Sequence, residues 1–353
     1  MKPSTTEQPL VTIVVVPRER FSCTQESLES IYQHTDIPFK LIYVDGNSPA
    51  KVRSYLETQA QEKQFQIIRT DYYLSPNHAR NIGLSQVNTK YLVFADNDII
   101  VSPGWLQALV NCAEETGATV VGPLMCEKEP VHEMVHFAGG ECRIITDIKG
   151  RRHLREKMYK QKQMVRDVHP QLQRTQTELA EFHCVLVRTE IFERIGFLDE
   201  AMLCTKEHLD FCLTVAQAGG KVYFEPDSIV TYVPGPPLEW TDIHFYMLRW
   251  SDAWTLESFQ RIQEKWNLVE DDGYFKTKYK QLGWRRRGTI IKPLTRRLSF
   301  GFENKPLKKV LSFLDTRLNR YLTNRYAQLL PQRKLQLTPI QSQKVLTPEL
   351  SKV

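Results

Sequence analysis

Two carboxylates separated by one residue follow a hydrophobic run in the first third of the chain. The run extends from Tyr91 to Ala95, and Asp96, Asn97 and Asp98 come directly after it. Such a run is typical of a buried strand that ends at a loop, where paired acids are costly unless a positive charge lies between them. The simplest partner is Mg²⁺ or Mn²⁺, which completes its coordination with water and substrate phosphates. The alternative is an ordinary turn, because Asp and Asn favour turns.

Strands and helices alternate over the first 125 residues. The patterns predict helices from Thr24 and at 52–63, 78–86 and 105–115, and strands at 11–16, 39–45, 66–69, 91–96 and 118–122. This alternation is typical of an α/β fold with parallel strands and right-handed crossovers. Ligands of such sheets bind beyond the carboxyl ends of the strands. Asp45 and the Asp96/Asp98 pair both fall at such ends, so they could face one crevice.

The pattern is weaker at 126–177. The strongly charged stretch 151–166 predicts a surface loop or lid, inside a longer loop at 145–178, and long loops beside a sheet are often functional. Further along, the patterns predict strands at 182–187 and 222–226, and helices at 189–195 and 205–218.

The charge of the chain is unevenly distributed. The 353 residues carry a net charge of +6, but 276–334 holds 17 Lys and Arg against two acids, a local balance of +15 that leaves −9 for the rest. Apolar residues interleave with these cations, which predicts amphipathic helices that could dock on an anionic membrane surface. The alternatives are a solvated face packed on the rest of the chain, or nucleic acid. No known nucleic-acid motif occurs here, so we expect no nucleic-acid partner.

The apolar runs, the N-terminus and the cysteines indicate where in the cell the protein is expected. No run approaches the roughly 18 apolar residues that span a bilayer, and the polar N-terminus does not resemble a signal peptide. The seven cysteines are scattered without a CxxC pair, which favours reduced, buried thiols over disulfides or a cysteine zinc site. We expect a cytoplasmic protein, which could associate with the inner face of a membrane, with disordered ends at 1–9 and 335–353.

Six short motifs occur in the order found in one enzyme family. They are the first strand with Pro17, then 43–48, 77–84, 96–98, 196–200 and 207–210. In turn they resemble the opening strand, the aspartate turn, the Ala-Arg-Asn-x-Gly-Leu element, the metal-binding DxD, the GGFDE-like turn and the Glu-Asp-x-Asp segment of family 2 glycosyltransferases. The resemblance covers about 10–235. It implies a GT-A nucleotide-sugar fold, a mixed sheet flanked by helices, with a helical basic extension at 236–334.

The resemblance implies how the two halves of this domain bind substrates. Residues 10–125 would bind a nucleotide diphosphate sugar, and 126–235 would bind the acceptor, which could be a glycan, a lipid-linked molecule or a protein. Pro17 and Asp45 would contact the donor. Asp45 would accept a hydrogen bond from a uracil-type N–H; it could also form an Asx turn, and the two roles are compatible.

The resemblance also implies a metal site. Asp98 would bind Mn²⁺ or Mg²⁺ directly, and the ion would stabilise the diphosphate leaving group. Asp96 would contact the ribose or reach the metal through water. Arg80 would hold phosphate or orient Asp96 by a bidentate pair, and its alternative is an ordinary helix-surface arginine.

An inverting transfer needs a base for the acceptor hydroxyl, and the resemblance places it at 207–210. Many members of the family have an aspartate after the glutamate, whereas this chain has His208. The base could be Glu207, His208 or Asp210. Glu207 and Asp210 share a helix face and each matches a family acid, while the unperturbed pKa of histidine, near 6.5, suits the task. The alternative is a helix N-terminus that favours acids.

Two other histidines are candidates of different kinds. Several GT-A enzymes take a third metal ligand from a histidine in the C-terminal part, which implies His244 here; a packed or exposed histidine is the alternative. His183 begins the strand that resembles the acceptor-side wall, where a histidine is more often part of the core than catalytic.

Together these features predict a metal-dependent glycosyltransferase that is inverting and uses a UDP-type donor. One alternative is a nucleotidyltransferase, which usually has a glycine-rich phosphate loop after the first strand. Residues 17–21 contain no glycine, which disfavours that class. The other alternative is a GT-A-like binding module without activity, which the departure at His208 keeps open.

Overall fold

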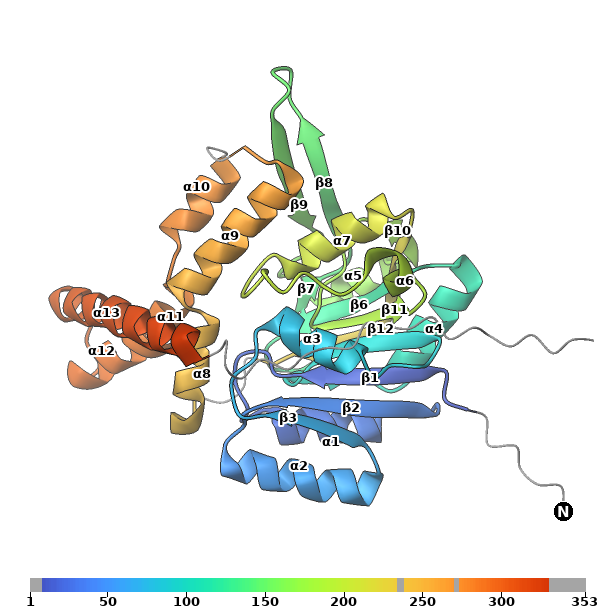
Figure 1. Ribbon diagram of the computed structural model, residues 1–353, viewed down its shortest axis with the longest axis horizontal. Coiled ribbons are helices and arrows are strands. Elements are labelled where there is room, and N and C mark those ends of the chain that lie inside the picture. The colour runs from blue at the N-terminus through green and yellow to red at the C-terminus, as the bar shows by residue number, and fades with distance from the viewer. Residues whose placement is uncertain (1–7, 234–237, 270–272, 330–353) are drawn as a thin grey trace, which may run out of the picture.

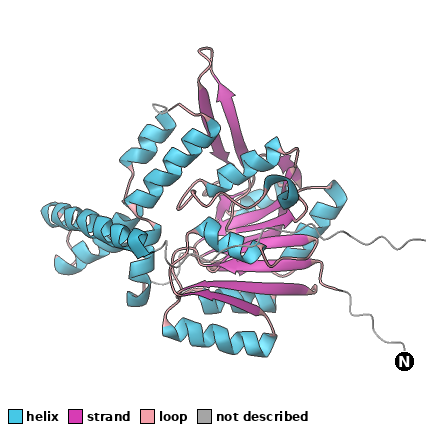
Figure 2. Ribbon diagram, viewed as in Figure 1, coloured by secondary structure: helices cyan, strands magenta, loops and turns pink. Residues whose placement is uncertain are grey.

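A mixed β-sheet flanked by helices forms the body of the protein (Figures 1 and 2). The computed structural model describes residues 8–233, 238–269 and 273–329. The strand order is β10-β12-β6-β11-β4-β1-β2-β3, with β5 paired to β12 and β7 to β6. The N-terminal elements are β1 (Val11–Val16), α1 (Thr24–Gln33), β2 (Phe39–Gly46), α2 (Ala50–Lys63), β3 (Gln66–Thr70), α3 (Pro76–Leu84), β4 (Tyr91–Asp96), β5 (Ile99–Val101), α4 (Trp105–Thr116) and β6 (Val120–Glu127).

The second half adds antiparallel strands and a helical region. Its first elements are β7 (Val135–Phe137), β8 (Gly140–Thr146), β9 (Arg152–Met158), α5 (Val165–Val168), β10 (Thr175–Thr177), β11 (Cys184–Arg188), α6 (Ile191–Ile195), α7 (Glu207–Gln217) and β12 (Val222–Tyr232). The helices that follow are α8 (Ile243–Arg249), α9 (Asp252–Trp266), α10 (Gly273–Lys280), α11 (Trp284–Arg286), the π-helix η3 (Arg287–Ile291), α12 (Lys292–Leu298) and α13 (Lys305–Leu329). The short helices η1 (His169–Gln171) and η2 (Trp240–Asp242) complete the set. The predicted fold class, a mixed sheet flanked by helices with a helical basic extension, is confirmed.

The centre of the sheet explains where the paired carboxylates lie. Every residue of β1 and β4 is buried, as expected for strands covered on both faces, which read as continuous hydrophobic runs. These strands pair in parallel with Val16 opposite Asp96, and β1 pairs in parallel with β2. The loop after β1 therefore lies beside the turn that carries Asp96 and Asp98.

The prediction of a loop over 145–178 was wrong for part of this segment. Strands β8 and β9 form an antiparallel hairpin that projects from the body (Figure 1), with Gly140 opposite Met158 and Thr146 opposite Arg152. Most of its side chains are partly or fully exposed. One face packs on the core through Cys142, Ile144, Leu154 and Met158, but Arg152 and Glu156 interrupt it on β9, so the alternating hydrophobic signal is weak.

The C-terminal helices are fastened to the body through buried polar contacts. Nδ2 of Asn319 on α13 donates to the carbonyl of Met247 on α8 at 2.7 Å, and the buried Arg286 donates through Nε to Oδ2 of Asp315 at 3.2 Å. The expected disordered tail at 335–353 and most of 1–9 lie outside the described residues. Among the helices that the structure describes, none combines the length and apolarity that a bilayer crossing requires.

Helix α3 packs directly on β1 at Gly83, where an added Cβ would lie 2.2 Å from Cγ1 of Val14. Because Val14 is fully buried in the central strand, the clash can be relieved only by moving the helix or the strand. We expect Gly83→Ala to lower the free energy of unfolding by about 3 kcal/mol, as measured by urea denaturation. Gly288→Ala is the control, because a Cβ there meets nothing within 4 Å. Equal stability of the two variants would refute this close packing.

Candidate functional site

A cavity of about 280 Å³ lies beyond the carboxyl ends of the central strands. Its walls are formed by the first half of the sheet, the antiparallel second half and the C-terminal helices. Its charged and aromatic lining includes Arg18, Arg80, Asp96, His136, Glu181, His183, Lys206, Glu207, His208, Tyr232, Arg249, Trp250, Lys278 and Arg285. The C-terminal helices supply the last four, so the basic extension forms part of the site.

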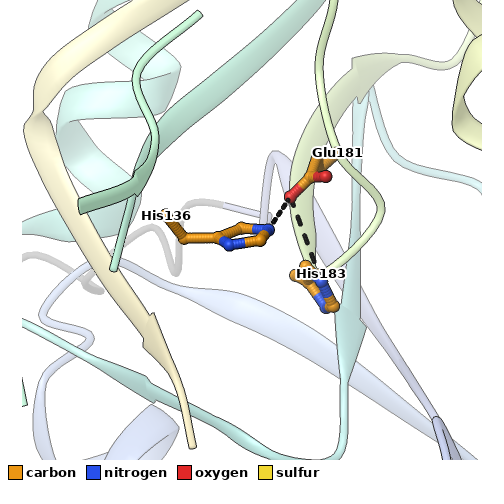
Figure 3. A group of neighbouring side chains, drawn as sticks. All are labelled: His136, Glu181 and His183. Atoms are coloured by element: carbon orange, nitrogen blue, oxygen red, sulfur yellow. Dashed lines mark ion pairs between the residues drawn. The ribbon is translucent and has the colours of Figure 1, made fainter. Parts of the chain in front are cut away.

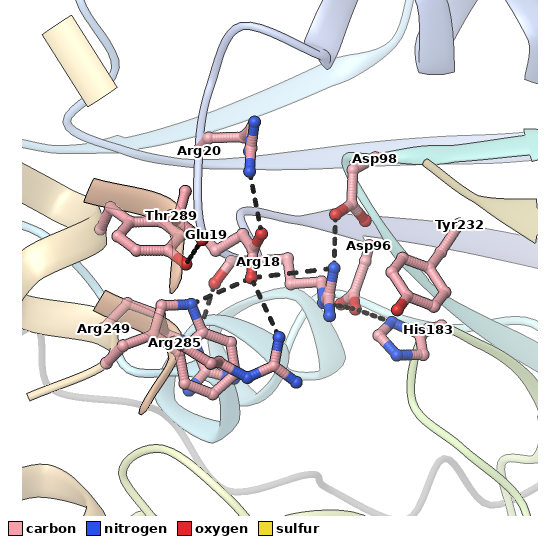
Figure 4. A network of polar contacts seen from close by, with 12 residues as sticks. Arg18, Glu19, Arg20, Asp96, Asp98, His183, Tyr232, Arg249, Arg285 and Thr289 are labelled. Atoms are coloured by element: carbon pink, nitrogen blue, oxygen red, sulfur yellow. Dashed lines mark hydrogen bonds and ion pairs between the residues drawn. The ribbon is translucent and has the colours of Figure 1, made fainter. Parts of the chain in front are cut away.

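Arg18 lies between the two carboxylates of the Asp96/Asp98 pair (Figure 4). Its Nη1 is 2.8 Å from Oδ2 of Asp98, and its Nε is 3.7 Å from Oδ2 of Asp96. Both acids are buried. Burial raises the pKa of Asp98 to about 6, although Arg18 acts in the opposite direction, and burial also raises the pKa of Asp96. The guanidinium of Arg18 therefore supplies a positive charge that this acidic pair requires.

Two further groups hold Asp96. Nη2 of Arg80 donates to its Oδ1 at 3.1 Å, and Nδ1 of His183 lies 2.9 Å from its Oδ2. Of the two roles predicted for Arg80, the structure shows contact with Asp96, made through one nitrogen and not as a bidentate pair. Arg80 is buried, with its guanidinium 4.1 Å from the ring centre of Phe182, so it is not the helix-surface arginine of the alternative.

Asp96, Asp98 and His183 could hold a divalent cation. One ligand atom from each lies within 4.8 Å of the others. Oδ1 of Asp98 is buried and accepts no hydrogen bond from the described residues, so it is available to a metal. Two carboxylates and an imidazole suit Mn²⁺ better than Mg²⁺, which prefers oxygen ligands. These residues fit the metal that the resemblance implies. Because Arg18 pairs with Oδ2 of Asp98, the metal would bind Oδ1, or Arg18 would move away from the carboxylate.

The structure does not bring His244 to this group. Its ring packs edge-on against Tyr73, with 5.2 Å between ring centres, and burial lowers its pKa. In the part of the chain that is described, the histidine grouped with Asp96 and Asp98 is His183. Strand pairing explains this position, because Cys184 on β11 lies opposite Ala95 on β4. His183, which the sequence pattern assigned to the core, thus reaches the Asp96/Asp98 pair.

Asp45 lies at the end of β2, but its carboxylate binds neighbouring protein groups. Oδ1 accepts from the backbone N–H of Ser48 and Oδ2 from its hydroxyl, each at 2.9 Å, and Arg69 contacts Oδ2. The structure thus shows the Asx turn. Pro17 lies nearby, where its Cγ would be 3.3 Å from a Cβ built on Gly46. Neither Asp45 nor Pro17 lines the cavity.

The three candidate bases have different surroundings. Glu207 and His208 both line the cavity. Oε1 of Glu207 is 3.5 Å from Nη2 of Arg249, while Oε2 of Glu207 and Nε2 of His208 form no hydrogen bonds with described residues. Asp210 is buried outside the cavity lining, and each of its oxygens accepts a 2.8 Å hydrogen bond from a lysine or a tryptophan of α9. The structure therefore brings Glu207 and His208 to the cavity and leaves Asp210 in a packing role.

Several charged residues of the cavity were missed from the sequence. Arg18 had a usable signal, because it comes two residues after β1 and strand ends carry sites in α/β sheets. His136 lies inside the segment 126–177, where the hydrophobic pattern is weak, and Glu181 lies just after it. Arg249 and Arg285 lie more than 200 residues from Arg18 in the sequence, and only tertiary packing brings them near it.

Comparisons with known proteins give the following similarities. The family model described as Glycosyl transferase family 2 matches residues 12–196. The pre-mycofactocin glycosyltransferase of Mycobacterium tuberculosis (strain CDC 1551 / Oshkosh) is 21% identical over 224 residues, which are 63% of this chain. The chain spans 42% of the length of that relative.

Two more proteins are similar over different extents. The GalNAc(5)-diNAcBac-PP-undecaprenol beta-1,3-glucosyltransferase of Campylobacter jejuni is 26% identical over 125 residues, covering 34% of this chain and 40% of the relative. The solved mannosyltransferase PcManGT of Pyrobaculum calidifontis, in complex with GDP-Man and Mn²⁺, is 16% identical with a TM-score of 0.47, covering 92% of this chain and 86% of the other.

The position of Arg18 leads to a stability prediction. We expect Arg18→Met to lower the free energy of unfolding of the metal-free protein by about 3–5 kcal/mol, because it removes the positive charge that pairs with the buried carboxylate of Asp98. Mn²⁺ should restore part of this loss by supplying the missing charge. The measurement is urea denaturation with EDTA and with Mn²⁺.

Arg53→Met is the matched control. Arg53 forms an exposed pair with Glu57, with 2.7 Å between Nε and Oε1, and its loss should cost at most about 0.5 kcal/mol. If Arg18→Met were as stable as the unmodified protein in EDTA, Arg18 would not be the required counter-charge.

Proposed function

This chain belongs to glycosyl transferase family 2, and we propose that it is an enzyme that transfers a sugar from a nucleotide diphosphate sugar to an acceptor hydroxyl. A UDP-type donor, dependence on a divalent cation and inversion at the anomeric carbon are parts of this proposal. The observation that carries it is the buried Asp96/Asp98 pair at the edge of a cavity rich in arginine. Acids of this kind suit a metal, and arginines suit the diphosphate that the metal would share.

The arginines support a role in donor binding. Arg18, Arg80, Arg249 and Arg285 all line the cavity, and guanidinium groups match the geometry of phosphate oxygens through paired N–H donors. Arg285 stacks on Trp250, with its guanidinium 4.0 Å from the ring centre, which fixes its direction. These side chains would bind the donor diphosphate and stabilise the negative charge that develops as the sugar leaves.

The divalent cation, held by Asp96, Asp98 and His183, would neutralise the leaving diphosphate without a proton. Arg80 keeps Asp96 in place through the 3.1 Å hydrogen bond. Arg249 donates through Nε to the carbonyl of Arg18 at 2.9 Å, so the C-terminal helices hold the loop after β1. These contacts preorganise the donor site before substrate binds.

Glu207 and His208 are the proposed acceptor-side groups. Both line the cavity, and each has a buried polar atom without a hydrogen bond to described residues. Either could accept the proton of an acceptor hydroxyl within hydrogen-bond reach. Asp210 would act as a positioning residue, because its two hydrogen bonds fix α7 against α9.

The alternative of a binding module without activity makes a different prediction. Such a protein would bind a nucleotide but would release no nucleoside diphosphate from a nucleotide sugar. Slow donor hydrolysis, which depends on the divalent cation, would exclude it.

We expect one member of a panel of UDP, GDP, CDP and ADP to bind in isothermal titration calorimetry, and Mn²⁺ to increase its affinity. Asp98→Asn should remove the Mn²⁺-dependent part, a loss of at least about 10-fold, because a direct ligand is lost. Asp227→Asn, at a side chain that is 77% exposed, should leave binding unchanged. The metal assignment fails if Asp98→Asn responds to Mn²⁺ like the unmodified protein.

A membrane surface is a further part of this proposal. Exposed apolar side chains lie on α12, α13 and the segment between them: Leu294, Leu298, Phe300, Phe302, Val310, Phe313, Leu314, Leu318 and Tyr321. Exposed cations on the same helices include Arg296, Arg297, Lys308, Lys309, Arg317 and Arg320. Apolar groups among cations suit the interface of an anionic bilayer. A lipid-linked acceptor, as the name of the Campylobacter relative describes for that protein, would place substrate and enzyme on one surface.

Flotation with vesicles tests the membrane surface. We expect the protein to bind phosphatidylcholine vesicles that contain phosphatidylglycerol and not pure phosphatidylcholine, with binding that falls as salt increases. The Lys308→Glu/Lys309→Glu variant should bind at least about 30-fold more weakly, from roughly 1 kcal/mol for each cation. The matched control is Lys160→Glu/Lys162→Glu, which changes two exposed lysines after β9. Equal losses in the two variants would show that α13 is not the docking surface.

A further inference from the structure

Three side chains from two parts of the chain meet at one wall of the cavity: His136 on β7, and Glu181 and His183 just before β11 (Figure 3). Oε2 of Glu181 lies 3.0 Å from Nε2 of His136 and 3.9 Å from Nε2 of His183. One ligand atom from each of the three residues lies within 4.8 Å of the others. The donor proposal does not assign Glu181 or His136.

Each histidine of this cluster has a carboxylate on its other nitrogen. Nδ1 of His136 is 3.5 Å from Oε2 of Glu127, and Nδ1 of His183 is 2.9 Å from Oδ2 of Asp96. These contacts direct the two Nε2 atoms towards Glu181. Histidines that bind metals have this arrangement, in which an outer carboxylate fixes the ring and its tautomer.

Glu181 has an oxygen that hydrogen bonds do not satisfy. The residue is 7% exposed, and its Oε2, 3.0 Å from Nε2 of His136, is among the buried atoms without a hydrogen bond from the described residues. A buried carboxylate needs a cation or hydrogen-bond donors, and the imidazole of His136 lies 3.0 Å from its Oε2.

We propose that His136, Glu181 and His183 bind a second divalent cation, of the zinc type, through two imidazole nitrogens and one carboxylate oxygen. Two histidines, one glutamate and an open fourth position form a known zinc donor set. With bonds of about 2.0–2.2 Å, ligand atoms on one zinc lie less than about 4.4 Å apart. Two of the separations, 3.0 and 3.9 Å, already fall in that range, and all three lie within 4.8 Å.

This site differs from the one at Asp96 and Asp98 in the nitrogen that it uses. The zinc-type site takes Nε2 of His183, whereas Nδ1 of the same ring faces Asp96. With zinc bound, Asp96 would accept the Nδ1 proton, so His183 would not at the same time be a ligand of the Asp96/Asp98 cation. All three zinc ligands and His208 line the cavity, so a fourth ligand would come from there. If the proposed transferase function holds, a hydroxyl bound there would have a lowered pKa, which would assist the acceptor where His208 stands in place of the family aspartate.

The test measures binding of Zn²⁺ and Co²⁺ to full-length protein that carries Asp98→Asn, which weakens the other site. We expect one Zn²⁺ per chain after dialysis, and visible Co²⁺ absorption typical of nitrogen ligation. Adding Glu181→Gln or His136→Gln should weaken binding by more than about 100-fold, since even the loss of an outer partner costs 10–100-fold. His34→Gln, which removes a histidine at the end of α1, should have no effect.

Two results would overturn the proposal. Asp98→Asn protein that retains no Zn²⁺ or Co²⁺ would show that the cluster is an ion pair only. Binding that survives both Glu181→Gln and His136→Gln would place the metal elsewhere. Circular dichroism identifies the variants that fold, so that either substitution can serve if the other fails. Nucleotide binding by the unmodified protein in Mn²⁺ without Zn²⁺ tests the donor site separately.

Discussion

Burial of two carboxylates at the end of a central strand is the constraint on which the rest of the site depends. Asp96 and Asp98 are nearly inaccessible to solvent, and such charges persist only with compensating partners. Arg18 and Arg80 provide them from the loop after β1 and from α3. Arg249 on α8 then binds the backbone of Arg18. The acidic pair therefore ties the C-terminal helices to the first strand of the sheet.

The same arrangement supports the proposed nucleotide-sugar donor. Arginines that neutralise Asp96 and Asp98 in the free protein would turn to phosphate oxygens if a cation took over the carboxylates. Exchange of this kind keeps the buried charge nearly balanced in both states, which lowers the cost of binding. The proposed cation at His136, Glu181 and His183 (Figure 3) would lie beside the Arg18 network, of which His183 is also a member (Figure 4).

The sequence predicted the parallel half of the sheet and the position of its acids, because β1 and β4 are continuous hydrophobic runs that end in charged turns. It did not predict the β8–β9 hairpin, because charged residues interrupt the one face that packs on the core and weaken the periodic signal. It selected His244 over His183 because strand pairing, which places Cys184 opposite Ala95, cannot be read from spacing. His136, Arg249 and Arg285 reach the cavity only through tertiary packing, so no local pattern marks them.

The most direct test of the donor site is a crystal structure with Mn²⁺ and the nucleoside diphosphate that binds most tightly, with anomalous scattering recorded at the manganese edge. We expect an anomalous peak at Asp96 and Asp98, the diphosphate beside it, and the guanidinium of Arg18 turned from Asp98 to a phosphate oxygen. A complex without a peak at these carboxylates, with the nucleotide elsewhere and Arg18 still bound to Asp98, would contradict a metal-supported donor site.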